Sequence, residues 1–271
     1  MHAAVPPMLE GAALFDDVSA CEAPAAFWWL GQHSFIVKID KNVILIDPYI
    51  APNPEREVPP LFAPRDAAGC VTLVACTHDH GDHIDPVAIE GLAAKTSVKF
   101  LAPRAHADRM RSLGVDDNRL HLVDDGESTR VGEVVIHGVK AAHEFFEQTE
   151  DGAFPFLGYI FEVGGKVIYH AGDTLWWEGL QQRLRRWSMD VAFVPINGRD
   201  ADRFKKNCLG NMTYQEAVDL VGGLDVKLVV PAHHDMFAFN SEDPGRFVQY
   251  YEAKYPGHAT WVGTPTERVT F

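Results

Sequence analysis

The seven-residue segment from Thr77 to His83 concentrates side chains that bind metals. Four of them follow an H-x-H-x-D-H spacing: His78, His80, Asp82 and His83. Neutral imidazoles and carboxylates bind zinc and manganese, and hydrolysis by two ions about 3.5–4 Å apart needs such ligands together with an open position for water. Side chains that alternate within one turn can point at two different ions. The segment therefore predicts a hydrolytic metal centre, and the alternative is a polar surface loop.

A buried strand is needed to position this segment. Residues 71–76 form a nearly continuous apolar run, which is typical of a strand buried on both faces, so the histidines follow the carboxyl end of a strand. Before it, apolar residues 35–37 and 43–46 flank the polar residues 40–42 and predict a hairpin. Residues 51–68 are rich in Pro and Ala and are interpreted as a loop.

Strands and helices alternate along the rest of the chain. Apolar runs predict strands at residues 98–101, 120–123, 134–136, 159–161, 167–169, 191–194 and 227–230. Helical spacing predicts helices over residues 104–113 and around residues 180–187, and Thr213 with Glu216 forms a capping box at the start of another helix. This order is typical of an α/β fold with two β-rich halves, and we expect one domain over residues 1–271.

The composition favours a protein that acts on small molecules. Hydrophobic residues make up 46% of the 271 residues, enough for a sizeable core, and a formal charge of −14 would repel the phosphate backbone of nucleic acid. The four cysteines show no C-x-x-C spacing and are interpreted as reduced thiols. No apolar stretch reaches the ~20 residues that a membrane span requires, and the first residues do not resemble a secretory signal. We therefore expect a cytoplasmic protein without a membrane span, and base rates favour a homo-oligomer.

The segment from Thr77 to His83 resembles the signature of the metallo-β-lactamase superfamily. Further motifs that contain His143, Asp173 and His233 occur in the order found in that superfamily. Within it, the chain is similar to the bacterial ascorbate-6-phosphate lactonases and their relatives, and the similarity is carried by residues 28–31, 77–85, 172–173, 211–213 and 233–235. It spans nearly the whole chain. The resemblance implies a four-layer αββα sandwich of the metallo-β-lactamase type.

The resemblance also implies a set of ligands for two divalent ions, zinc or manganese. The first ion would be bound by His78, His80 and His143, the second by Asp82, His83 and His233, and both by Asp173. A water between two dications loses a proton near neutral pH and becomes a nucleophile, which gives Asp82 and Asp173 a catalytic role.

Other polar residues of these motifs are expected to support the ligands. Asp79 would orient a ligand imidazole, and His234 would contact substrate or deliver a proton as a catalytic residue. His170 lies three residues before Asp173, and a buried, hydrogen-bonded packing role is an equal alternative to a role in the site. For His143 the alternative is a place on a surface loop.

Loops beside the metal-bearing strand ends are expected to bind the substrate. Asn197 and Arg199 follow a predicted strand, and the guanidinium of Arg199 could bind an anionic substrate with two hydrogen bonds. Lys205 and Lys206 lie nearby in the sequence and would add positive charge, although residues 199–206 equally fit a solvated face. Trp176 could form a wall of the pocket or simply pack.

The resemblance implies a binuclear metal-dependent hydrolase. A metal-bridging hydroxide would attack an ester, lactone or phosphoester bond of a small anionic metabolite, with a sugar-acid phosphate lactone as the first candidate. A phosphodiesterase similar to N-acyl-phosphatidylethanolamine phospholipase D is the alternative among hydrolases. A di-iron redox protein similar to the flavodiiron oxygen reductases is another, but those proteins have a glutamate where this sequence has His80. The third alternative, a metal-binding protein without catalysis, would have a closed coordination shell.

Overall fold

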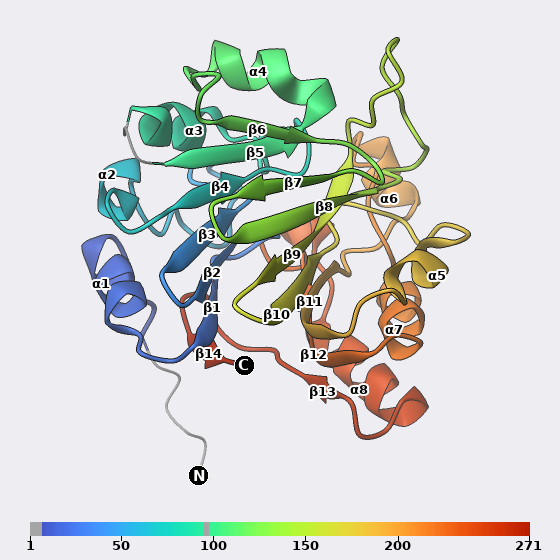
Figure 1. The fold of residues 1–271 in the computed structure, drawn as a ribbon. Helices are drawn as coiled ribbons and strands as arrows, with labels where there is room; N and C mark the ends of the chain where they lie inside the picture. The colour runs from blue at the N-terminus through green and yellow to red at the C-terminus, as the bar shows by residue number, and fades with distance from the viewer. Residues whose placement is uncertain (1–6, 95–97) are drawn as a thin grey trace.

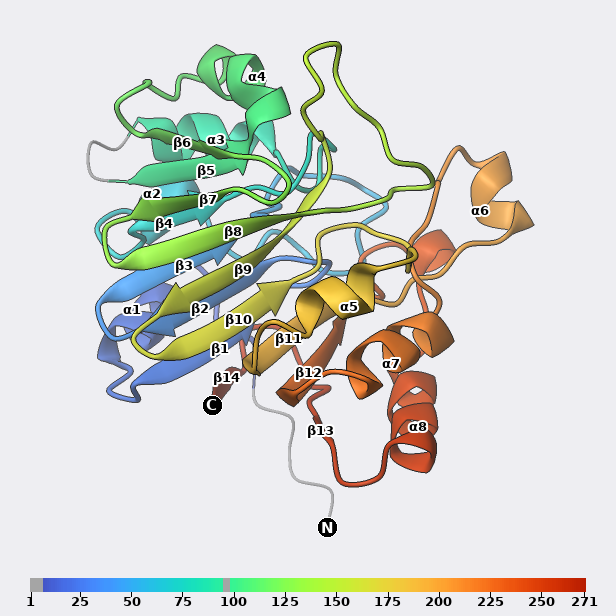
Figure 2. The same ribbon diagram turned by 45° about the vertical axis from the view of Figure 1, so that its right-hand side comes forward.

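Two seven-stranded sheets face each other, and helices cover their outer surfaces (Figures 1 and 2). The structure, a computed structural model, describes residues 7–94 and 98–271. The first sheet has the order β14-β1-β2-β3-β4-β5-β6 and the second the order β13-β12-β11-β10-β9-β8-β7. Among the described residues, no helix is both long enough and apolar enough to cross a membrane.

The first sheet is formed mainly by the N-terminal half of the chain. Its strands are β1 (Ala25–Trp29), β2 (Phe35–Ile39), β3 (Asn42–Ile46), β4 (Leu73–Ala75), β5 (Lys99–Pro103), β6 (Leu120–Val123) and β14 (Arg268–Thr270). Its helical segments are α1 (Ala12–Ala20), α2 (Pro64–Ala67), α3 (Pro86–Ala93), η1 (Arg104–His106) and α4 (Ala107–Ser112). β3, β4, β5 and β6 are parallel, so their carboxyl ends meet at one edge.

The second sheet contains the later strands. They are β7 (Ser128–Val131), β8 (Val134–Lys140), β9 (Leu157–Val163), β10 (Lys166–His170), β11 (Met189–Pro195), β12 (Val226–Ala232) and β13 (Ala259–Thr260). The helical segments of this half are α5 (Leu180–Leu184), α6 (Ala201–Lys205), α7 (Tyr214–Gly222), η2 (Ala238–Asn240) and α8 (Pro244–Lys254). β10, β11 and β12 are parallel, so this sheet also has an edge of carboxyl ends.

Three apolar layers hold the elements together. In β1 the side chains alternate: Trp28 packs under the helices of the first half, whereas Phe27 points between the sheets. There Phe27 meets the ring of Phe193 at 5.2 Å, and Phe35 stacks on Phe193 at 3.9 Å. A third layer joins α5, α7 and α8 to the outer face of the second sheet. This is the arrangement of helix, sheet, sheet and helix that the resemblance implied, and the predicted fold class is confirmed.

The strands predicted from apolar runs are all present, with bounds that differ by a few residues. The helices differ more. Residues 104–113 divide into η1 and α4, α5 ends at Leu184, and the predicted loop over residues 51–68 contains the short helix α2.

Two helices, α3 and α8, were not predicted. The side chain of Asp85 caps α3 and that of Asp243 caps α8, and each of these residues is followed immediately by a proline. An Asp-Pro pair at a helix start was a readable signal.

The capping box predicted at Thr213 is present at the start of α7. The Thr213 hydroxyl accepts from the backbone N–H of Glu216, and the Glu216 carboxylate accepts from the backbone N–H of Thr213 at 2.9 Å. Thr213→Ala removes one cap, so we expect it to lower the free energy of unfolding by about 1 kcal/mol. Chemical denaturation measures this change. Ser188→Ala, at an exposed position with no hydrogen bond among the described residues, should change it by less than about 0.5 kcal/mol; equal effects would contradict the capping role.

Candidate metal centre

The predicted ligands lie where the carboxyl ends of strands from both sheets meet. His78 to His83 follow β4 in the first sheet, whereas His143, Asp173 and His233 follow β8, β10 and β12 in the second. Gly172 allows the segment after β10 to lie close to its neighbours: it has φ +60°, and a Cβ added there would lie 2.4 Å from the backbone oxygen of Leu157 in β9 and 3.3 Å from Cβ of Thr77, which follows β4. The short chain segments after four strand ends therefore converge on one site.

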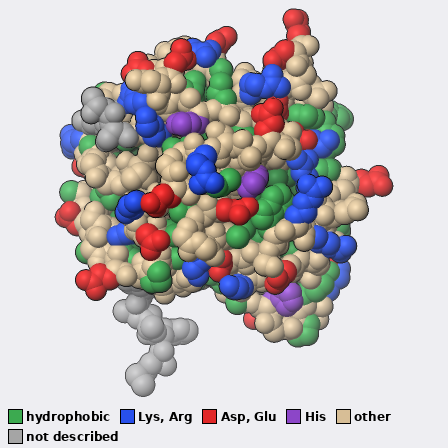
Figure 3. Space-filling view, viewed as in Figure 1, with side chains coloured by type: hydrophobic (Ala, Val, Ile, Leu, Met, Phe, Trp, Pro, Cys, Tyr) green, Lys and Arg blue, Asp and Glu red, His purple; other side chains and the backbone are tan. Residues whose placement is uncertain are grey.

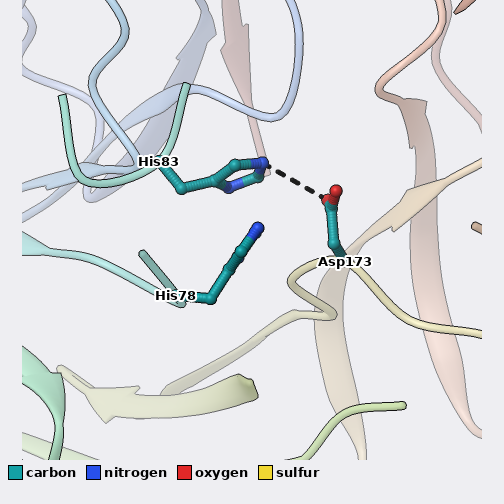
Figure 4. Close-up of side chains that lie close together, drawn as sticks. All are labelled: His78, His83 and Asp173. Atoms are coloured by element: carbon teal, nitrogen blue, oxygen red, sulfur yellow. Dashed lines mark ion pairs between the residues drawn. The ribbon is translucent and has the colours of Figure 1, made fainter. Parts of the chain in front are cut away.

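Asp173 lies at the centre of this site, and its side chain is almost fully buried. One carboxylate oxygen is 3.0 Å from Nε2 of His233, and the other is 3.5 Å from Nε2 of His83. Figure 4 shows the rings of His78 and His83 directed toward this carboxylate. His78, His83 and Asp173 place one ligand atom each within 4.8 Å of one another, and so do Asp82, His83 and His233.

The histidines assigned to the first ion also form a group. The ring of His80 lies 4.6 Å from that of His78 and 5.1 Å from that of His143, measured between centroids. His143 is 5% exposed, so it does not occupy the surface position that was the alternative. The structure thus brings together all seven residues of the predicted ligand set.

The carboxylates around the His83 ring show that the site attracts a cation. Nδ1 of His83 lies 2.8 Å from a carboxylate oxygen of Asp47, which fixes the proton on that nitrogen. The other ring nitrogen, Nε2, faces two further carboxylates, those of Asp173 at 3.5 Å and Asp82 at 3.7 Å. Nε2 of His83 and Oδ1 of Asp173 are buried without a hydrogen-bond partner among the described residues. A divalent cation satisfies all of these atoms, so the residues fit a metal centre.

The electrostatics of the site agree with this fit. Burial lowers the pKa of His83, but Asp173, Asp82 and Asp47 together raise that pKa well above its usual value. Burial likewise acts against the charged form of Asp173, yet His233 and His83 hold the pKa of its carboxyl well below the usual range. The carboxylate of Asp173 is therefore ionised, and the site is strongly favourable to positive charge.

The residue that orients a ligand is Asp47 and not, as predicted, Asp79. Asp47 is fully buried after β3 and accepts hydrogen bonds from the backbone N–H and the hydroxyl of Thr77 as well as from His83. The carboxylate of Asp79 points outward to the guanidinium of Arg109 at 3.0 Å. An acidic residue directly after the predicted strand 43–46 was the sequence signal for Asp47.

Sequence reasoning also missed Gln32 and His33, which connect β1 to β2. The Gln32 amide donates to the carboxylate of Asp82 at 2.6 Å. Both ring nitrogens of the fully buried His33 lack a hydrogen-bond partner among the described residues, and Nδ1 is 3.5 Å from Asp173. Burial lowers the pKa of His33 to about 4, so the ring is neutral. Two polar residues shortly after an apolar strand were the missed signal.

His170 supports His33 and does not face the carboxylates. Its ring stacks on that of His33 at 4.0 Å, and its Nε2 donates to the backbone oxygen of His33 at 2.9 Å. Burial and the neighbouring His33 lower the pKa of His170 to about 3, which keeps it neutral. The packing alternative for His170 therefore agrees with the structure.

Several residues of the site have a backbone conformation that is costly for their type. Gln32, Asp47 and His233 have φ angles of 52°, 44° and 58°, in the left-handed region that favours glycine. Such residues persist where surrounding contacts fix them, and they are common at functional sites. Hydrogen bonds supply the contacts here: the backbone oxygen of Gln32 accepts from the backbone N–H of His233, and its N–H donates to Asp235.

A cavity of about 740 Å³ opens over the metal-binding residues. Asn197 is the predicted substrate-binding residue that lines it, and its buried amide is held between those of Asn211 and Asn240. Residues that sequence reasoning did not select for substrate binding include Tyr49, Asn53, Phe237 and Phe239 on its walls. The cavity thus combines aromatic walls with amide groups near the metal-binding end.

Three other predicted residues do not line this cavity. The guanidinium of Arg199 is held by the carboxylate of Glu216 through two contacts of 2.6 and 2.7 Å, so it is not free to bind a substrate in this conformation. Trp176 lies in the loop that follows β10. It is 38% exposed and lines a different surface hollow, beside α5. His234 is buried against the ring of Trp29 at 5.2 Å, and burial and His233 lower its pKa to about 4. Its catalytic role stays a prediction.

Comparison with known proteins gives consistent matches. Residues 42–234 match the family described as "Beta-lactamase superfamily domain". A UPF0173 metal-dependent hydrolase from Geobacillus is 32% identical over 79% of this chain and 88% of its own length. Another from Opitutus terrae is 29% identical over 89% of this chain and 97% of its own length.

Solved structures support the same fold. A metallo hydrolase from the archaeon Ignicoccus hospitalis superimposes with a TM-score of 0.73 at 26% identity, covering 91% of this chain and 98% of that one. A diiron β-hydroxylase from Streptomyces venezuelae matches with a TM-score of 0.69 over 93% of this chain and 55% of that one; its 14% identity shows the fold alone. None of these four proteins is described as a lactonase, so the resemblance to the ascorbate-6-phosphate lactonases stays a prediction.

Proposed function

The chain belongs to the β-lactamase superfamily and, within it, to the UPF0173 metal-dependent hydrolases, and from this premise we propose that it uses two divalent ions, zinc or manganese, to hydrolyse a small anionic metabolite. The bond attacked is an ester, a lactone or a phosphoester, and a sugar-acid phosphate lactone is the first candidate. The observation that carries the proposal is the buried Nε2 of His83, which has no hydrogen-bond partner among the described residues and faces two carboxylates.

The two ions would be held in the arrangement that the resemblance implied. His78, His80 and His143 would bind one, Asp82, His83 and His233 the other, and Asp173 both. Ions in this position polarise the scissile bond and lower the pKa of an attacking water. Asp47 fixes the ring of His83 through its hydrogen bond, and Gln32 fixes the carboxylate of Asp82, so both ligands are held in position before substrate enters.

The charge of the cavity wall supports an anionic substrate. Among the described residues that line the cavity, Lys206 is the only lysine, and no arginine is present. Its ammonium lies 4.9 Å from the ring centroid of Phe239, and no ion pair holds it within the described part of the chain. Lys205, in contrast, is 3.4 Å from the carboxylate of Asp202 and does not line the cavity. We assign substrate attraction to Lys206 in place of Arg199.

Lys206→Gln is expected to raise KM for an anionic substrate about tenfold and to change kcat less than about twofold, because the lost interaction is present in both the ground state and the transition state. Steady-state kinetics with a charged substrate and its neutral ester measure the effect. Lys205→Gln is the matched control and should leave KM unchanged. A similar KM change for the neutral ester would contradict the assignment.

A substrate screen tests the proposed function directly. The protein loaded with zinc or manganese is assayed against lactones, sugar phosphates and phosphodiesters, with and without a chelator. We expect chelator-sensitive turnover of at least one anionic lactone or phosphoester. Turnover of phosphodiesters alone would favour the phospholipase D-like alternative, and oxygen consumption by the iron-loaded protein without any hydrolysis would contradict the hydrolase assignment.

A further inference from the structure

A second cavity, of about 590 Å³, lies beside α5 and is lined by basic side chains. Lys140, Arg183 and Arg186 contribute to its lining together with Trp177, Gly179 and Gln182. It shares no lining residue with the cavity over the metal-binding residues. In Figure 3, Lys and Arg side chains gather toward the right-hand side of the face shown, where Figure 1 places α5. This concentration of positive charge stands out on a chain with a formal charge of −14.

The ammonium of Lys140 lacks an acceptor for its three N–H donors. It lies 4.4 Å from the ring centroid of Phe146, 5.3 Å from Phe154 and 5.2 Å from Trp177. These rings attract a cation but accept no conventional hydrogen bond, and Nζ of Lys140 makes no hydrogen bond or ion pair within residues 7–94 and 98–271. A partly buried ammonium in this state is best stabilised by an anion that enters the cavity.

One carboxylate balances only part of the basic charge. The guanidinium of Arg183 is 2.6 Å from Asp125, and the same carboxylate oxygen accepts the backbone N–H of Lys140. Arg186 is exposed, and the part of the chain that the structure describes offers it no hydrogen bond or ion pair. Of the three cations, Arg183 alone is paired with a carboxylate among the described residues, which leaves two positive charges to be neutralised by a ligand.

We propose that this cavity binds the phosphate group of a small phosphorylated molecule. Phosphate carries close to two negative charges at pH 7, and its oxygens match the donors of Lys and Arg. The concave shape and the size of the cavity fit a metabolite, and the negative charge of the whole protein opposes binding of an extended polyanion such as nucleic acid. The proposal is independent of the hydrolytic function, because it concerns a site outside the metal cavity.

Calorimetric titration of the metal-loaded protein with inorganic phosphate tests this site. We expect saturable binding, and Arg186→Glu should weaken it at least tenfold. Lys140→Gln should act in the same direction because it removes the ammonium. Arg65→Glu makes the same charge change on α2, in the other half of the molecule, and should alter the Kd less than twofold. Circular dichroism confirms the fold of each variant, and the exposed Arg186 gives a variant that does not depend on packing.

Two results would overturn the proposal. The first is the absence of saturable phosphate binding to the unmodified protein. The second is binding that persists unchanged in Arg186→Glu; its loss when a chelator removes the metal would then place the phosphate at the metal centre. Because the hydrolytic assay is performed separately, failure of this site leaves the proposed function unaffected, and the two outcomes are distinguishable.

Discussion

Asp173→Asn is expected to reduce hydrolysis about 1000-fold, a loss of about 4 kcal/mol in transition-state stabilisation. The carboxylate lies between His83 and His233 and is the side chain assigned to both ions, so the amide removes the negative charge that holds the ions as a pair. Asparagine keeps the size and one oxygen ligand, and we expect both ions to stay bound. Steady-state kinetics together with metal analysis of the same sample measure the two properties.

Asp190→Asn is the matched control for this substitution. Asp190 is also a buried carboxylate of the second sheet, but it lies at the amino end of β11, where it contacts Lys166 and Lys227. Its replacement should leave kcat/KM within about twofold of that of the unsubstituted protein, provided that both proteins are fully folded under the assay conditions. Unchanged turnover in Asp173→Asn would show that Asp173 has no part in catalysis.

Asp47→Asn is expected to weaken metal binding by about 10- to 100-fold, the range found when residues that orient a metal ligand are replaced. Asp47 accepts three hydrogen bonds, from Thr77 twice and from His83 once. An amide at this position presents an N–H₂ group to at least one of these donors, so the proton on Nδ1 of His83 is no longer fixed. Competition with a chromophoric chelator measures the affinity.

Asp79→Asn provides the comparison for Asp47. Asp79 lies inside the histidine-rich segment, whereas Asp47 is distant in sequence, yet only Asp47 contacts a ligand imidazole in the structure. Because the Asp79 carboxylate contacts an exposed arginine, its replacement should change metal affinity less than twofold. Equal losses in the two variants would contradict the assignment of His83 orientation to Asp47.

The ligands could be predicted because they are local in sequence or lie at strand ends. The spacing of His78, His80, Asp82 and His83 carries its own chemical signal, and the apolar run before it places the group at the edge of a sheet. The resemblance supplied the distant residues His143, Asp173 and His233, which no spacing argument connects. The strands and the α/β class followed from the alternation of apolar runs, since strands buried on both faces leave a strong pattern, whereas the four-layer packing was implied by the resemblance.

The supporting residues could not be predicted because they depend on tertiary contacts. Gln32 reaches Asp82 across 50 positions of sequence, and its left-handed backbone is fixed by His233 and Asp235 from the other half of the chain. The pairing of Arg199 with Glu216 across the capping box of α7 likewise involves residues 17 positions apart. Such contacts decide whether a polar side chain faces a cavity or a neighbour, and a single sequence does not encode them in its local pattern.

Quantitative metal analysis of the protein, purified without added metal or chelator and again after loading with zinc or manganese, tests the central claim most directly. The ligand set predicts two equivalents per chain, with at least one removed by His78→Ala and at least one by His233→Ala. One equivalent or none after loading, or two equivalents that both substitutions leave in place, would contradict a binuclear centre at this site.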